Sequence, residues 1–148
     1  MNQSGLHENM IECHLALRHS AGKLKTHYLS RSWLTEIMKT LTTDAEIEQV
    51  LMHHPAVLVL FGGAHCGVCQ AIKPQLDQLV AQDFPRMESV YIDCAQNAGQ
   101  VCAGRGIFSL PVVQIWFEGQ HFGDHVRVFS MRDIRSALER PYKTLFGH

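Results

Sequence analysis

The sequence lacks a charge excess, a long hydrophobic run and any low-complexity segment. Its 13 Lys and Arg against 14 Asp and Glu leave a formal net charge of -1, so no basic surface points to nucleic acid or to a membrane. The longest apolar stretch, Ala56–Phe61, is far shorter than the roughly 20 residues of a membrane-spanning helix. With 46% hydrophobic and 18% charged residues, the composition argues against gross disorder and favours an ordinary globular protein.

A secretory signal and an even set of cysteines are also missing. No basic segment followed by an apolar one opens the chain. The five cysteines are an odd number, so at least one thiol has no partner within a monomer. Both features favour a reducing compartment, and we expect a cytoplasmic protein.

The N-terminal residues differ from the rest of the chain. Residues 1–34 are rich in His and show no sustained helical or strand period. We expect a poorly ordered extension over residues 1–34, followed by one domain over residues 35–148. An alternative hypothesis is that Met38 is the biological start, which the intact mass of the native protein would test.

From residue 36 onward, strand and helix patterns alternate. The expected strands are 37–41, 56–61, 90–92, 112–117 and about 125–129. Four helices are expected: one that begins at Thr43, one from Cys66 to about Gln82, a short one within 94–106, and one over 131–140 that Pro141 ends. Thr43 and Glu46 can form a capping box, and Pro55 should stop the first helix. This order predicts an α/β fold, with a mixed sheet of about five strands and helices on both faces.

The motif Cys66-Gly67-Val68-Cys69 lies between a buried strand and a helix. Two thiols separated by two residues can close a disulfide and reopen it. The first thiol lies where unpaired backbone N–H groups and the helix dipole favour a thiolate. A zinc site would need about four ligands, and no second pair follows at a suitable spacing, so we expect no metal.

Residues 36–140 resemble the thioredoxin family. Besides the C-x-x-C, the matching residues are Pro74, Tyr91-Ile92-Asp93 at the end of the third strand, Gly106-Ile107 leading into Leu110-Pro111, and Phe117-x-Gly119 at the hairpin turn. The resemblance implies a thioredoxin fold and a protein-disulfide oxidoreductase without a bound cofactor. Its implied partners are protein disulfides and, as electron source, a reductase or small thiols.

The resemblance also assigns roles to individual residues. Cys66 would attack a substrate disulfide as thiolate, and Cys69 would resolve the mixed disulfide and form the redox-active disulfide. The active-site loop would comprise His65, Gly67 and Val68. Pro111 would follow a cis bond beside the disulfide and, with Leu110, offer its backbone to an extended substrate segment.

The active site departs from the family at several positions. The family commonly carries Trp-Cys-Gly-Pro-Cys-Lys, and a buried Asp and a Lys stand where this chain has Leu60 and Ser89. We therefore expect slower deprotonation of Cys69 and a stabilising effect of Leu60. His65 could lower the pKa of Cys66, move protons in place of the Asp, or simply face solvent. His65→Ala is expected to raise the pKa of Cys66, which a thiolate titration tests.

Other residues near these motifs have open interpretations. Arg127 stands where the family often has Gly, and could select acidic partners or have no role. We expect Cys94 and Cys102 to be idle or buried thiols, with a regulatory disulfide as the alternative. His121 and His125 are interpreted as exposed polar residues.

Three alternatives to a reductase stay open. The chain could be an oxidant or a redox sensor. It could be a binding or assembly module with little turnover, which insulin reduction by the wild type and by Cys66→Ser would test. Two chains could also share an iron–sulfur cluster through their C-x-x-C motifs.

Overall fold

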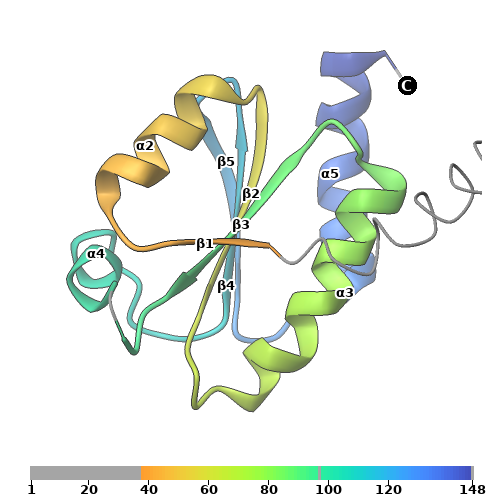
Figure 1. The fold of residues 1–148 in the computed structure, drawn as a ribbon. Helices are drawn as coiled ribbons and strands as arrows, with labels where there is room; N and C mark the ends of the chain where they lie inside the picture. Colours follow the sequence, from red (N-terminus) through yellow and green to blue (C-terminus); the bar gives the residue numbers. More distant parts are fainter. Residues whose placement is uncertain (1–37, 97, 148) are drawn as a thin grey trace, which may run out of the picture. The chain divides into compact units, whose positions relative to one another are not determined.

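The computed structural model describes residues 38–96 and 98–147 (Figure 1). The elements are β1 (Lys39–Leu41), α2 (Asp44–His53), β2 (Ala56–Gly62), α3 (Gly67–Asp83), β3 (Glu88–Asp93), α4 (Gly99–Gly104), β4 (Val112–Phe117), β5 (Gln120–Val126) and α5 (Met131–Phe146). The expected extension, residues 1–34, lies outside the described residues, as does Ile37, where the first strand was expected to begin.

The five strands form one mixed sheet in the order β1-β3-β2-β4-β5. Strands β1, β3 and β2 are parallel, and β4 and β5 each run antiparallel to their neighbour. All seven residues of β2 are buried, because helices cover this central strand on both faces. The predicted α/β architecture with a five-stranded mixed sheet is therefore confirmed.

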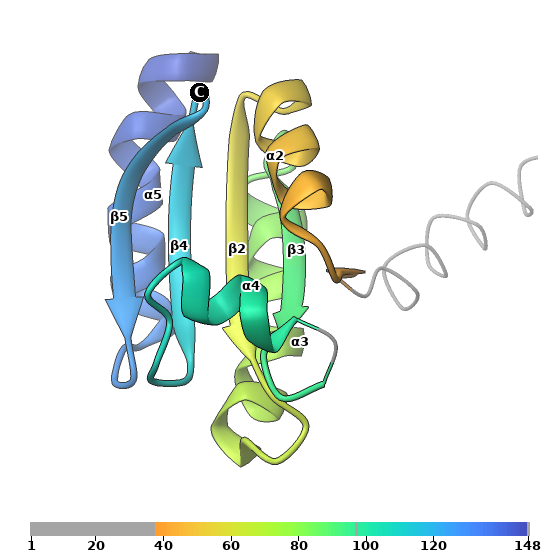
Figure 2. The same cartoon turned by 90° about the vertical axis from the view of Figure 1, so that its left-hand side faces the viewer.

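Helices α3 and α5 cover one face of the sheet, and α2 and α4 cover the other (Figures 1 and 2). Side chains of β2 alternate between the two layers. Leu58 and Leu60 belong to the core cluster that contains residues of α3 and α5. Val57, Val59 and Phe61 belong to the cluster that contains residues of α2 and α4. Each face of β2 thus supplies one of the two hydrophobic cores.

The first described helix begins and ends as the sequence predicts. Thr43 is the N-cap of α2, its side chain accepts from the N–H of Glu46, and the Glu46 carboxylate accepts from the N–H of Thr43 at 3.0 Å. The same carboxylate also accepts from the N–H of Thr42. The backbone bonds from Thr42 and Thr43 lower the pKa of Glu46, and the one from Thr42 contributes most. The helix ends at His53, two residues before Pro55.

The prediction that Pro141 ends the last helix is wrong. Helix α5 continues to Phe146 with Pro141 inside it. The Tyr142 ring packs against Phe84 at 5.1 Å and against Phe146 at 4.6 Å between ring centroids, and the Tyr142 hydroxyl accepts from the N–H of Arg86 at 2.9 Å. The tertiary contacts with Phe84 and Arg86, together with the packing on Phe146 one turn later in α5, outweigh the hydrogen bond that a proline removes from a helix, which costs about 3 kcal/mol.

The fifth strand begins earlier than predicted. Strand β5 spans Gln120–Val126 instead of starting near His125. Only Glu118 and Gly119 connect it to β4, with φ values of 52° and 72°. Two central residues with positive φ match the right-handed twist of paired strands, so the hairpin closes in two residues.

The topology places three loops at one end of the sheet. Gly62, at the carboxyl end of β2, pairs with Asp93, at the carboxyl end of parallel β3. Phe61 pairs with Val112, at the beginning of antiparallel β4. The loops that carry the C-x-x-C, Cys94 and Pro111 therefore leave the sheet beside one another.

Candidate active site

The two motif cysteines form a disulfide at the start of α3. Cys66 is the N-cap residue of this helix and is half-buried, whereas Cys69, one turn later, is 0% exposed. Their Cα atoms lie 5.2 Å apart. The structure thus places one sulfur within reach of a substrate and the other beneath it.

The start of α3 provides a favourable environment for negative charge on Cys66. Its sulfur accepts a hydrogen bond from the N–H of Cys69 at 3.2 Å. The first turn carries no acidic side chain that would occupy the positive end of the helix dipole. Since thiolate sulfur is a stronger acceptor than thiol sulfur, the same contact favours the ionised form once the disulfide opens.

Two glycines before the motif bring neighbouring segments into contact. A Cβ on Gly63 would lie 3.3 Å from Cβ of Ala95 and 3.4 Å from Cδ1 of Leu110. The N–H of Cys94 donates to the carbonyl of Gly62 at 2.8 Å. The loops after β2 and β3 and the segment before β4 therefore meet at the C-x-x-C loop, as the topology requires.

The segment before β4 carries a cis peptide bond between Leu110 and Pro111. The carbonyl of Pro111 accepts from the N–H of Arg127 at 2.8 Å, which holds the segment after β5 against it. Arg127 has a φ of 63°, a left-handed conformation that costs a non-glycine residue about 1–2 kcal/mol. The guanidinium-bearing residue is thus held next to Pro111.

Exposed apolar side chains occur in the same segments. Val68, inside the motif, is 56% exposed, and Phe108, three residues before Pro111, is 82% exposed. His65 and Gly67, the other two sequence-predicted loop residues, are also exposed. The motif and the segment before Pro111 thus each offer an exposed apolar side chain.

The core beneath the motif contains no carboxylate on β2. Leu60 is fully buried and pairs with Tyr91 of β3 and Val113 of β4. Ser89 donates its hydroxyl to the Asp77 carboxylate at 3.3 Å. The acid–base pair that the family resemblance would supply at these two positions is therefore replaced by an apolar side chain and a hydroxyl.

The expectation that Cys94 and Cys102 are idle thiols is wrong, because the structure pairs them. They form a second disulfide with a Cα–Cα distance of 5.7 Å. Cys94 follows β3 and Cys102 faces the core from α4, so the bond ties this six-residue helix to the end of the sheet. A short helix has little stability of its own, and this cross-link supplies it. The eight-residue separation across a loop was the signal that the sequence offered.

Replacing Cys94 with Ser is expected to lower the free energy of unfolding of the oxidised protein by about 2–3 kcal/mol. A cross-link of this span restricts the unfolded chain, and the variant loses that restriction. Urea unfolding with and without dithiothreitol measures the effect, which should disappear under reducing conditions. An equal loss in both conditions would assign the effect to packing instead of the covalent bond.

His121 is exposed as expected and lies at the hairpin end of β5, whereas the expectation is wrong for His125, which is half-buried and pairs with Val113 near the start of β4. His121 contacts Asp124 with 2.7 Å between Nε2 and Oδ1, and its ring packs near Trp116. Within residues 38–96 and 98–147, no group of three or more His, Cys, Asp or Glu side chains is placed to hold a metal ion. No helix in this described part is long and apolar enough to cross a membrane.

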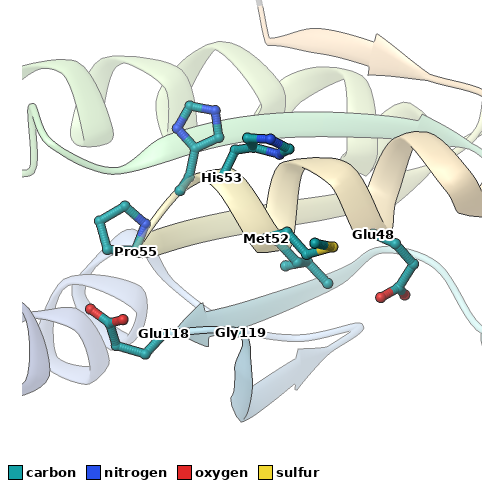
Figure 3. A pocket seen from close by; sticks show the side chains of 8 residues that line it. Glu48, Met52, His53, Pro55, Glu118 and Gly119 are labelled. Carbon is teal, nitrogen blue, oxygen red and sulfur yellow. The ribbon is translucent and has the colours of Figure 1, made fainter.

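A pocket of about 450 Å³ lies at the opposite end of β2 from the motif. Residues of α2 and of the β4–β5 turn line it, among them Met52, His53 and Glu118 (Figure 3). The seven residues of β2 separate it from the C-x-x-C by about 20 Å. It therefore contributes nothing to the chemistry of the cysteines.

Comparison with known proteins gives a consistent result. A family model described as thioredoxin matches residues 38–140. The chain is 26% identical over 110 residues to the thioredoxin-like protein YdfQ of Bacillus subtilis, with 74% of this chain and 96% of that protein covered. It is also 26% identical over 100 residues to the chloroplastic thioredoxin-like 3-2 of Arabidopsis thaliana, covering 65% of this chain and 52% of that protein. The matched region thus spans about half the length of the Arabidopsis relative.

Solved structures agree on the fold. A mutant thioredoxin from Halobacterium salinarum superposes with a TM-score of 0.63 at 19% identity, covering 69% of this chain and 88% of that one. Oxidised thioredoxin O2 from Arabidopsis thaliana gives a TM-score of 0.62 at 20% identity, covering 72% and 96%. Because the family model matches well over half of the sequence, the chain belongs to the thioredoxin family, and the Cys66–Cys69 pair supports thiol–disulfide oxidoreductase activity.

Proposed function

We propose that this chain reduces protein disulfides, with Cys66 as the nucleophile and Cys69 as the resolving thiol. The observation that carries the proposal is the asymmetry of the pair. The Cys66 sulfur caps α3 and accepts a backbone N–H, while Cys69 is buried beneath it. A nucleophile must be ionised and accessible, and a resolving thiol must be close and shielded.

The reaction takes place in two exchanges. The Cys66 thiolate attacks one sulfur of the substrate disulfide, forming a mixed disulfide and releasing the other substrate sulfur as a thiolate. The Cys69 thiolate then attacks Cys66, so that the Cys66–Cys69 bond forms and the second substrate thiolate leaves. Two electrons pass from the dithiol to the substrate, and a reductase or small thiols would restore the dithiol.

The segment around Pro111 is the proposed substrate site. Leu110 lies near Gly63, just before the motif, and Val68 in the motif and Phe108 before Pro111 are exposed. An extended substrate segment would add alongside this backbone as a short strand. We place the protein in a reducing compartment such as the cytoplasm, where its dithiol form would be maintained.

A single-turnover experiment tests the proposal. The fully reduced protein is mixed with insulin, quenched with acid and alkylated, and peptide mass spectrometry follows the Cys66–Cys69 disulfide. We expect this disulfide to accumulate together with free insulin B chain. Unchanged Cys66 and Cys69 thiols after incubation would contradict the proposal and favour a binding module instead.

Arg127 is proposed to favour substrates with acidic residues next to the disulfide. Its backbone N–H donates to the carbonyl of Pro111, so the residue lies at the edge of the proposed substrate site. Arg127→Gln is expected to raise the KM for an acidic disulfide peptide by up to about fivefold, the size of an exposed ion pair, with no change for a neutral peptide. The difference should shrink at high salt. Equal effects on both peptides would contradict the assignment.

A further inference from the structure

The Tyr91 side chain lies in the core directly beside Cys69. A Cβ on Gly62 would lie 2.9 Å from Cε2 of Tyr91, 3.1 Å from its Oη and 3.0 Å from Cβ of Cys69. The phenol and the resolving cysteine therefore both border the space where Gly62 has no side chain. Tyr91 pairs with Leu60, so it packs beside the β2 position that lacks a carboxylate.

The Tyr91 hydroxyl is buried without a hydrogen-bond partner among the described residues. The residue is 4% exposed, and its Oη makes no hydrogen bond to any described protein group. Folding alone does not favour this arrangement, because a phenylalanine would fill the same space without burying a polar atom. The other buried tyrosine, Tyr142, has a partner for its hydroxyl in the N–H of Arg86.

The surroundings keep Tyr91 protonated. Burial raises the pKa of Tyr91, and the charge of Asp93 on the same strand raises it further. The Gln70 side chain, which approaches the hydroxyl without reaching hydrogen-bond geometry, opposes the shift. From α3, the Lys73 ammonium lies 4.0 Å from the centre of the ring. Strand β2 contributes only Leu60 and Gly62 here, which carry no charge. The hydroxyl is thus a donor at neutral pH and not a base.

We propose that Tyr91 is a positioning residue for Cys69, donating a hydrogen bond from its hydroxyl to the Cys69 sulfur when that sulfur becomes a thiolate. The inference rests on the proposed reductase function. At position 60 the family's buried carboxylate is replaced by Leu60, and the neutral phenol of Tyr91 would instead help to form the Cys69 thiolate. An unpartnered donor beside a sulfur that must become an anion acquires its acceptor at that step.

Resolution of the mixed disulfide needs no proton transfer from Tyr91. Cys69 loses its proton to water or buffer, and its thiolate attacks the Cys66 sulfur of the mixed disulfide. The Cys66–Cys69 bond forms, the bond from Cys66 to the substrate breaks, and the substrate thiolate takes a proton from water. Tyr91 keeps its proton throughout and stabilises the attacking thiolate.

Tyr91→Phe tests the proposal, since it removes only the hydroxyl. The acid-quenched insulin assay, repeated from pH 6 to pH 10, resolves formation of the Cys66 mixed disulfide from its resolution by Cys69. A hydrogen bond to a charged acceptor predicts a shift of about one pH unit in the thiolate titration of Cys69. Thiolate reactivity falls as thiol acidity rises, so the variant should resolve about threefold more slowly at low pH and about threefold faster at high pH. Formation of the mixed disulfide should not change.

Tyr142→Phe is the matched control, because it removes the hydroxyl of an equally buried tyrosine that lies on α5 and is bonded to the N–H of Arg86. It should lower the melting temperature and leave resolution unchanged at every pH, whereas Tyr91→Phe should not lower the melting temperature. A slowing by the same factor at all pH values, or no slowing, would overturn the role of Tyr91. Absence of the mixed disulfide in the wild type would instead overturn the proposed function itself.

Discussion

Cys66→Ser is expected to abolish disulfide reduction, with a loss of at least about a thousandfold in turnover of insulin. The serine hydroxyl is not ionised at neutral pH, so the substrate disulfide meets no nucleophile. Cys69→Ser should behave differently, because Cys66 can still attack. The substrate would then remain attached to Cys66, and mass spectrometry of the intact protein would show the adduct.

The burial of the two sulfurs is the reason for this difference. Cys66 is half-buried at the N-cap, and Cys69 is completely covered. Cys94→Ser is the control, since it removes a cysteine of the second disulfide and should leave insulin turnover within about twofold. The assigned roles would be contradicted if the two single variants formed substrate adducts equally readily, because the buried Cys69 would then attack as well as Cys66 does.

Leu60→Asp is expected to destabilise the protein by about 3–4 kcal/mol at neutral pH, although it introduces the residue type that the family commonly has there. Leu60 is fully buried between Tyr91 and Val113, and an ionised carboxylate there would lose its hydration. The apolar side chain thus contributes directly to the stability of the core beneath Cys69.

The pH dependence of this variant identifies the cause. Burial would raise the pKa of the new carboxyl above its ordinary value of about 4, so the folded state would bind a proton more tightly than the unfolded state. Relative to wild type, stability should therefore be greatest below about pH 4 and fall as the pH rises. Leu60→Asn, which does not ionise, is the control, measured by urea unfolding from pH 4 to pH 8. A pH-independent loss equal to that of Leu60→Asn would mean that the core accommodates the charge.

The central elements were predictable because local and tertiary signals agree there. The apolar run of β2 is buried along its whole length, and the capping residues Thr43 and Cys66 begin their helices where expected. The placement of the C-x-x-C at a helix start followed directly from these elements. The sequence alone therefore predicts a redox-active cysteine pair at a helix start, but not the contacts around it.

The remaining features depend on contacts between distant residues, which a linear pattern does not contain. Pro141 remains inside α5 because Tyr142 packs against Phe84 and its hydroxyl accepts from the N–H of Arg86, both far away in the sequence. The Cys94–Cys102 disulfide forms because α4 is oriented so that Cys102 faces the end of β3, and the sequence does not give this orientation. In the sequence, Tyr91 stands out only as part of the Tyr91-Ile92-Asp93 motif, and its proposed role depends on Gly62 and Cys69, which the fold brings to it.

The reduction potential of the Cys66–Cys69 pair tests the central claim most directly. The protein is equilibrated against glutathione buffers of known potential, and thiol trapping with mass spectrometry separates this pair from the Cys94–Cys102 disulfide. A reductase of the thioredoxin type should give a value near about -270 mV. A value of about -200 mV or higher would contradict the account, because the pair would then accept electrons from substrate thiols and act as an oxidant.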